Sequence, residues 1–245
     1  MEFLFEQTVT VKAEDCDEFG NFRLSSLLYY AQEAAGGHCK TIGMDWDSMA
    51  AKGMFWAVLR HRVVITHLPK AGEEIRLQTW PMPVTRAAYP RSVRATDATG
   101  NKLFDVVSLW VLMNTESRAM IVPGKSGVCV PGIVLGDEPA APGTLIPGNY
   151  ENSCMWAVSS QDLDLNGHVN NAIYLDYAEA LAGDFRQNRT PKEVQVCYLA
   201  EVRLGQEIKL SWELSEEAVL AVEGTRIKAD DPEKAERVFA ARVHY

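Results

Sequence analysis

The sequence predicts an α+β fold built twice, with each copy formed by one long helix that lies against an antiparallel sheet. Residues 15–36 align with residues 162–183 at a constant offset and without a gap, which indicates an internal duplication. A Gly-Glu/Gln-Glu-Ile turn-and-strand signature follows in each copy, at 72–77 and 205–210. Between the copies, residues 123–150 hold five of the eleven prolines and six of the seventeen glycines, which is the composition of a linker. The matched identities include Asp15/Asp162, Asp17/Asp164, Gly20/Gly167, Tyr30/Tyr177, Ala31/Ala178, Ala35/Ala182 and Gly36/Gly183.

Residue periodicity predicts the individual elements. Residues 3–13 alternate in polarity and indicate a strand. Apolar residues at helical spacing predict one helix near 24–36 and a second near 169–183. Consecutive strands after each helix favour an antiparallel sheet, and the apolar helix face must be buried against it. A sheet wrapped around a central helix is the hotdog arrangement, so the prediction is a double hotdog. Its parts are an N-terminal repeat (1–122), a linker (123–150) and a C-terminal repeat (151–245).

Composition narrows the functional classes. A hydrophobic content of 47% and a charged content of 23% are typical of a soluble globular protein. The net charge of −9 argues against nucleic acid as a partner. The sequence contains no apolar run of membrane-spanning length and opens directly into strand-like residues, so we expect neither a membrane span nor a leader. Five scattered cysteines without a CxxC spacing favour reduced thiols, and we expect a cytoplasmic protein.

Polar residues concentrate where the second helix is predicted to begin. Asp164, Asn166 and His168 precede the helix, whereas the first copy has Phe19 and Asn21 in place of the last two. Backbone N–H groups at a helix start favour negative charge, so the second copy is predicted to perform carbonyl chemistry, with the Val169 N–H as an oxyanion donor.

This loop could instead hold a structural histidine or a calcium ion. A histidine at this position can simply cap a helix or form part of the core, although the asymmetry between the copies disfavours that role. The Asp-x-Asp-x-Asn-Gly run also imitates a calcium loop. The bidentate Glu required at its twelfth position is replaced by Ile173, so we predict no metal site and no cofactor.

The run Asp164-x-Asn166-x-His168-Val169-Asn170-Asn171-x-x-Tyr174 resembles the signature of acyl-acyl carrier protein (acyl-ACP) thioesterases, double-hotdog enzymes of plant plastids and bacteria. The resemblance extends over nearly the whole chain, and single-hotdog acyl-CoA thioesterases share pieces of the motif. It implies hydrolysis of the thioester that joins a fatty acyl chain to its carrier protein, and acyl carrier protein as the partner.

The resemblance also implies roles for individual residues. Asp164, Asn166 and His168 stand where the family has its Asp, Asn and His, and Glu201 is the best match for a later Glu. In thioester hydrolysis Asp164 would fix side-chain geometry and Asn166 would orient water or the thioester, with either His168 or Glu201 as the general base. Glu201 is expected on a strand, with Cys197 on the same face as a core residue. Plant members have a Cys after that Glu. Val202 occupies the position here, which favours direct attack by water without an acyl-enzyme.

The first copy lacks the polar set and is therefore predicted to shape the acyl tunnel through Leu27, Leu28 and Trp56. Because carrier protein is acidic, a basic docking patch is expected. The candidate arginines are Arg60 and Arg62, or Arg86, Arg91 and Arg94. The assembly is expected to be a monomer or a homodimer of double hotdogs.

Three alternative functions remain open. They are an acyl-CoA thioesterase, a hotdog dehydratase or hydratase, and a non-catalytic acyl-binding module. The Asp-x-Asn-x-His-Val-Asn-Asn run argues against the dehydratase, and retention of the polar set in one copy argues against the binding module.

Overall fold

The computed structural model describes residues 3–164, 166–227 and 235–245. The chain forms two compact units, Met1–Phe22 with Ser26–Pro142 and Arg23–Ser25 with Gly143–Tyr245. The division falls inside the predicted linker, where residues 127–151 form neither helix nor strand. Among the described helices, none is both long enough and apolar enough to cross a membrane.

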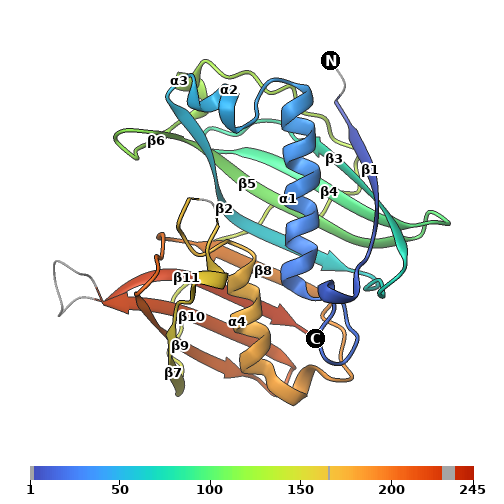
Figure 1. Cartoon of the computed structure of the whole chain (residues 1–245), viewed down its shortest axis with the longest axis vertical. Helices are drawn as coiled ribbons and strands as arrows, with labels where there is room; N and C mark the ends of the chain where they lie inside the picture. Colours follow the sequence, from blue (N-terminus) through green and yellow to red (C-terminus); the bar gives the residue numbers. More distant parts are fainter. Residues whose placement is uncertain (1–2, 165, 228–234) are drawn as a thin grey trace. The chain divides into compact units, whose positions relative to one another are not determined.

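The first unit is an antiparallel sheet with one long helix. Its strand order is β1-β3-β4-β5-β2, and a short strand β6 pairs with β5. Figure 1 shows α1 lying across one face of this sheet. The elements are β1 (Phe5–Thr10), η1 (Ala13–Asp15), α1 (Leu24–Thr41), α2 (Trp46–Ala50), β2 (Met54–Ile65), β3 (Glu74–Pro81), β4 (Tyr89–Asp97), β5 (Lys102–Asn114), β6 (Met120–Ile121) and α3 (Pro123–Ser126).

The second unit repeats this plan with a shorter helix. Its strand order is β7-β9-β10-β11-β8, again antiparallel, and α4 packs against β10 and β11. The rings of Tyr174 and Phe239 lie 4.5 Å apart at this contact. The elements are β7 (Asn152–Ala157), η2 (Ser160–Asp162), α4 (Ile173–Ala182), η3 (Gly183–Arg186), β8 (Glu193–Tyr198), β9 (Glu207–Leu214), β10 (Val219–Ile227) and β11 (Ala235–His244).

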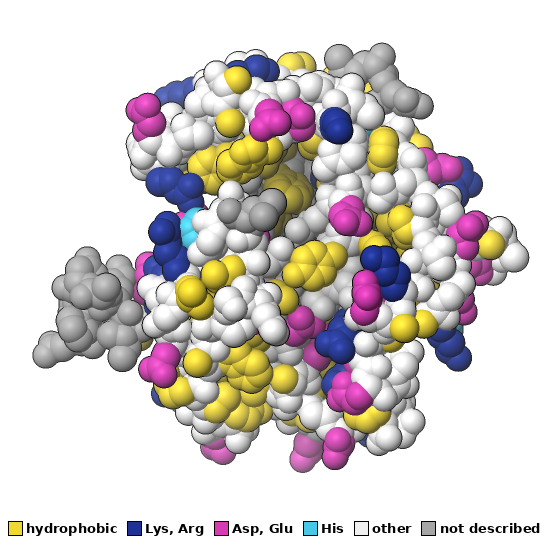
Figure 2. Space-filling model, in the orientation of Figure 1, with side chains coloured by type: hydrophobic (Ala, Val, Ile, Leu, Met, Phe, Trp, Pro, Cys, Tyr) yellow, Lys and Arg dark blue, Asp and Glu magenta, His cyan; other side chains and the backbone are white. Residues whose placement is uncertain are grey.

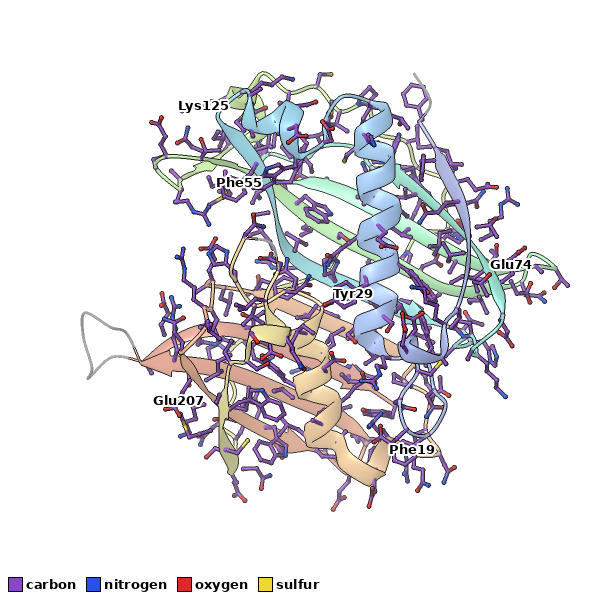
Figure 3. The ribbon with its side chains drawn as sticks, viewed as in Figure 1. Phe19, Tyr29, Phe55, Glu74, Lys125 and Glu207 are labelled. Atoms are coloured by element: carbon purple, nitrogen blue, oxygen red, sulfur yellow. The ribbon has the colours of Figure 1, made fainter. Side chains whose placement is uncertain are left out.

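The two units share one topology, which confirms the predicted double hotdog. Each strand of the first order has its counterpart at the same place in the second. Glu74 and Glu207, the first residues of β3 and β9, occupy equivalent positions (Figure 3). The turn before each helix is also repeated, because the backbone N–H of Lys12 donates to Asp15 at 2.9 Å and that of Ser159 donates to Asp162 at 2.7 Å.

The helices follow the prediction with one correction. The apolar stripe of α1 is buried, with Leu27 and Leu28 fully inaccessible, and this helix runs on to Thr41. The second helix does not begin at residue 169 as predicted, because α4 starts at Ile173. The side-chain oxygen of Asn170 accepts the N–H of Ala172 at 2.9 Å, so residues 170–172 form a turn that sets the helix start.

Candidate active site

The loop before α4 is organised by one carboxylate. Oδ1 of Asp164 accepts the backbone N–H groups of Asn166 at 2.8 Å and of His168 at 3.3 Å. The Asp164 N–H donates to the carbonyl of His168 at 2.8 Å, which closes the turn. Gly167 has a φ of 74°, a left-handed conformation that glycine adopts without steric cost. The sequence therefore fixes the position from which the His168 side chain leaves the backbone.

The first unit contains the same turn. Oδ1 of Asp17 accepts the N–H groups of Phe19 at 2.9 Å and of Asn21 at 2.8 Å, and Gly20 has a φ of 79°. The shared turn is thus a structural element of both repeats. What distinguishes the second copy is its side chains, because Asn21 occupies the position that His168 has in the second unit.

The loop pairs with the segment that follows β8. His168 and Arg203 form an antiparallel bridge, and the N–H of Val169 donates to the carbonyl of Val202 at 2.8 Å. This corrects the prediction that Val169 supplies an oxyanion donor. Its N–H is already used, and it lies ahead of the helix rather than at its start.

This pairing brings Glu201 to His168. Nε2 of His168 lies 3.1 Å from Oε2 of Glu201, although the ring N–H is not aligned for a hydrogen bond. The imidazole is 14% exposed and the carboxylate 46%, so the pair borders solvent with the histidine more deeply set. Glu201 is not on a strand as predicted, because β8 ends at Tyr198 and the carboxylate belongs to the following loop.

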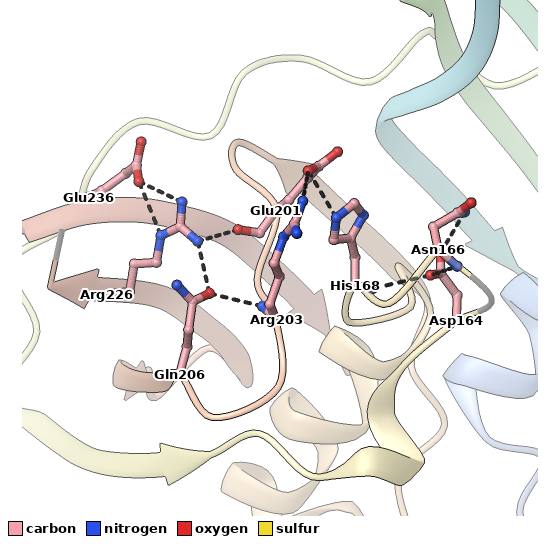
Figure 4. A network of polar contacts seen from close by, with 8 residues as sticks. All are labelled: Asp164, Asn166, His168, Glu201, Arg203, Gln206, Arg226 and Glu236. Atoms are coloured by element: carbon pink, nitrogen blue, oxygen red, sulfur yellow. Dashed lines mark hydrogen bonds and ion pairs between the residues drawn. The ribbon is translucent and has the colours of Figure 1, made fainter. Parts of the chain in front are cut away.

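A polar network positions the Glu201 loop (Figure 4). Arg226 of β10 binds the Glu236 carboxylate through Nε at 3.1 Å and through Nη2 at 2.8 Å, and its Nη1 donates to the Glu201 carbonyl. The same Nη1 donates at 3.0 Å to Oε1 of Gln206, which also accepts the Arg203 N–H at 2.9 Å. Sequence reasoning missed this network because nothing in the spacing of these residues relates them to the HVNN loop.

Two further observations concern Cys197 and metal binding. Cys197 is buried, and its Sγ contacts the Gly143 carbonyl at 3.6 Å, as expected of a core residue; it does not share a strand face with the loop residue Glu201. Within the described ranges, no three His, Cys, Asp or Glu side chains are grouped to hold a metal ion.

The first unit contains a pocket of about 240 Å³ between α1 and its sheet. Trp56 lines it, whereas Leu27 and Leu28 do not, because they are fully buried on the helix face that packs into the core.

Two of the arginines predicted to form a docking patch are not available at the surface. Arg91 is buried, and Arg94 is bound to Asp105 at 2.8 Å and to Asp137 at 2.9 Å.

Comparison with known proteins identifies the family of the chain. The family model described as acyl-ACP thioesterase N-terminal domain matches residues 2–123, and the model described as acyl-ACP thioesterase C-terminal domain matches residues 149–239. A palmitoyl-acyl carrier protein thioesterase of Gossypium hirsutum chloroplasts is 25% identical over 189 residues, which cover 71% of this chain and 46% of that protein. The chain spans about half the length of the curated relatives it matches.

Solved structures agree on the fold. A 12:0-ACP thioesterase from Umbellularia californica superposes with a TM-score of 0.82 at 20% identity, covering 100% of this chain and 97% of that one. An acyl-ACP thioesterase from Bacteroides thetaiotaomicron gives a TM-score of 0.81 at 19% identity, covering 98% and 97%. Both family models match in chain order and together cover most of the sequence. This chain belongs to the acyl-ACP thioesterase family.

Proposed function

We propose that this protein hydrolyses fatty acyl-acyl carrier protein thioesters to a free fatty acid and the carrier thiol. The contact between His168 and Glu201 carries the proposal, because it places a basic nitrogen beside a carboxylate in the repeat that has the polar loop. Two further supports are the family membership and the chemistry that relatives are named for, such as the palmitoyl-acyl carrier protein thioesterase of Gossypium hirsutum.

In the proposed mechanism, a water molecule attacks the thioester carbonyl directly. The Glu201 carboxylate stabilises the positive charge that His168 acquires when the imidazole removes a proton from this water. The protonated imidazole then returns the proton to the departing sulfur. Neither step requires a covalent acyl-enzyme, and Val202 stands where a thiol nucleophile would be expected from plant members of the family.

Asn166 is proposed to orient the water or the thioester and to stabilise the oxyanion. One of its side-chain N–H groups is directed to Oδ2 of Asp164 at 3.3 Å, and an amide nitrogen carries two N–H groups. The second N–H is therefore available to the substrate on an exposed side chain. Asp164 acts indirectly, by fixing the turn from which both Asn166 and His168 project.

The acyl chain is proposed to occupy the pocket of the first unit, because this unit lacks the Asn and His of the polar loop in the second unit. Its walls include the aromatic rings of Trp56 and Tyr89, which meet edge to face with centroids 5.0 Å apart.

We further propose that the protein acts as a monomer or homodimer in the cytoplasm, where its five free cysteines would stay reduced. Light scattering after gel filtration would determine the assembly.

A panel of thioesters tests the proposal. Purified protein is incubated with acyl-carrier and acyl-CoA substrates of several chain lengths, and release of free thiol is followed. Because Cys129 is exposed, a Cys129→Ser variant removes its contribution to a thiol reagent. Turnover of carrier-bound chains well above that of CoA-bound chains supports the proposal. Preference for CoA would make it an acyl-CoA thioesterase, and release of neither thiol would favour a binding module.

A further inference from the structure

Arg226 is a partly buried side chain of β10 that the proposed mechanism does not use. Its ion pair with Glu236 alone indicates little, since side chains of both charges are spread over the face shown in Figure 2. What distinguishes Arg226 is that Nη1 of the same guanidinium donates to the main-chain carbonyl of Glu201 and, at 3.0 Å, to Oε1 of Gln206 (Figure 4). The rigid guanidinium therefore connects β10 and β11 to the loop that carries Glu201.

The main chain around Glu201 is held from two sides. Arg226 binds the Glu201 carbonyl, and the next carbonyl along the chain, that of Val202, accepts the Val169 N–H at 2.8 Å. This segment belongs to the loop between β8 and β9. Because the Glu201 side chain is 46% exposed, packing restrains it less than the main chain that carries it. Its distance of 3.1 Å from Nε2 of His168 thus depends on both supports.

The turn after Glu201 is present in both repeats. The Gln206 N–H donates to the Arg203 carbonyl at 3.2 Å, and Oε1 of Gln206 accepts the Arg203 N–H at 2.9 Å. In the first unit Glu73 and Lys70 make the same two contacts, each at 3.1 Å. The turn itself is therefore an element of the fold, and its presence does not require a role in the chemistry.

The arginine, in contrast, is specific to the second repeat. Thr225 of β10 and Thr96 of β4 pair with equivalent residues of β9 and β3. The residue that follows is Arg226 in the second unit and Asp97 in the first. An ionised acid cannot donate to a carbonyl, and Oδ1 of Asp97 instead accepts the Asn101 N–H at 2.8 Å within its own hairpin.

The residue that Arg226 supports differs between the repeats as well, because alignment of the shared turn places Leu68 where the second repeat has Glu201. The first repeat thus keeps the turn but has neither the carboxylate nor the arginine. We propose that Arg226 is a positioning residue, which binds Glu236 and holds the Glu201 main chain so that the carboxylate stays beside His168. The inference rests on the proposed function, since it takes the pair of Glu201 and His168 to carry out hydrolysis.

Kinetics of Arg226 variants test this role. Displacing a reacting group by about 1 Å can lower a rate about 10²-fold, so Arg226→Met, which removes every donor, should lower kcat roughly 10- to 100-fold. KM should stay near the wild-type value, because Arg226 acts on the chemical step and not on substrate binding. Arg226→Lys keeps the charge and a donor for the Glu201 carbonyl and should recover part of the lost kcat. Hydrolysis of the best thioester of the panel is measured, with thermal melts to confirm folding.

A double variant separates positioning from a general structural role. If Arg226 acts through Glu201, Arg226→Met should cause hardly any further loss of turnover in a protein that already carries Glu201→Gln. Protein is used in excess over substrate so that slow turnover is measured. Arg237→Met is the matched control, because Arg237 on β11 is 25% exposed and binds the Glu223 carboxylate at 2.6 Å and the Leu145 carbonyl at 3.3 Å. It should keep the wild-type kcat.

Two results would overturn the inference: a folded Arg226→Met protein with wild-type kcat, or losses from Arg226→Met and Glu201→Gln that multiply in the double variant. Should Arg226→Met fail to fold, Glu236→Gln decides in its place. It weakens the hold on the guanidinium and should lower kcat severalfold, but only where Glu201 is intact. A wild-type protein that hydrolyses none of the thioesters would refute the proposed function and this inference with it. An active wild type whose Arg226 and Glu236 variants are equally active would refute the inference alone.

Discussion

Nε2 of His168 lies 3.1 Å from Oε2 of Glu201, and the two residues are brought together by a backbone ladder rather than by helix or strand periodicity. The N–H of Val169 bonded to the carbonyl of Val202 fixes the two loops against each other at this point. The Arg226 guanidinium, held by Glu236, fixes the Glu201 backbone from the other side. Both side chains are thus positioned by the frame of the second unit before any substrate arrives.

The carboxylate partner gives the first prediction. Glu201→Gln preserves size but removes the charge that stabilises protonated His168, and turnover should fall about 10²–10⁴-fold, the usual contribution of general base catalysis. Because the Glu201 side chain is 46% exposed, thermal stability should hardly change. Steady-state hydrolysis and a thermal melt measure both. Glu207→Gln, at an exposed position on β9, is the control and should remain as active as wild type.

The asymmetry between the repeats gives the second prediction. His168→Ala should reduce turnover about 10²–10⁴-fold, and Asn166→Ala about 10²–10³-fold, since they remove a base and an oxyanion donor. Asn21→Ala alters the equivalent position of the same turn in the first unit and should change turnover by much less than tenfold. An Asn21→Ala protein that folds normally but is as inactive as His168→Ala would show that both repeats take part in the chemistry.

The proposed direct attack by water gives the third prediction. Cys197 is fully buried in the second unit, so Cys197→Ala should keep its turnover and lose only a little stability to the small cavity. Mass spectrometry of the protein quenched during turnover should find no acyl group on any cysteine. A trapped thioester on the enzyme would replace direct attack by water with covalent catalysis.

The pH dependence of folding gives the fourth prediction. Complete burial lowers the pKa of His61 to about 3, and its Nδ1 lies 2.8 Å from the Ser108 hydroxyl. The unfolded chain, with an ordinary histidine pKa near 6.5, then binds more protons than the folded chain. The contribution of His61 to stability is fully present above pH 6.5 and falls by up to about 1.4 kcal/mol per pH unit as the pH drops towards 3.

Urea unfolding between pH 7 and pH 4 measures this dependence. The variant His61→Asn should show a shallower decline of unfolding free energy than wild type. His67→Asn, at an exposed position in the loop after β2, should follow the wild-type curve. Parallel declines for His61→Asn and wild type would mean that His61 does not control acid sensitivity.

The fold could be predicted from the sequence because duplication is a strong signal. The offset that aligns Asp15 with Asp162 recurs in both three-residue turns and both Asp-Gly loops, and the two strand orders match as well. The start of α4 was misplaced because Val169 continues the apolar stripe, while the hydrogen bond that ends the loop comes from the side chain of Asn170. Periodicity carries no information about such a side-chain hydrogen bond.

The candidate site residues could be named from the sequence, but the contacts between them could not. The motif identified Asn166 and His168, and the family resemblance identified Glu201. The hydrogen bond from the Val169 N–H to Val202, and the one from Arg226 to the Glu201 carbonyl, join segments that are distant in sequence. Local sequence patterns do not encode such contacts. Trp56 could be named as a candidate pocket residue because it stands in an apolar run.

The central claim is that the second repeat performs the chemistry and the first selects the acyl chain, and chain-length profiles test it most directly. Hydrolysis of acyl-carrier substrates of several lengths is compared for wild type, Trp56→Ala and Leu28→Ala. Trp56→Ala enlarges the pocket, so the preferred length should shift towards longer chains while the best substrate is still hydrolysed efficiently. Leu28→Ala, in the core and outside the pocket lining, should lose roughly 2–5 kcal/mol of stability and keep the wild-type profile. An unchanged profile in a well-folded Trp56→Ala protein would contradict the division of labour between the repeats.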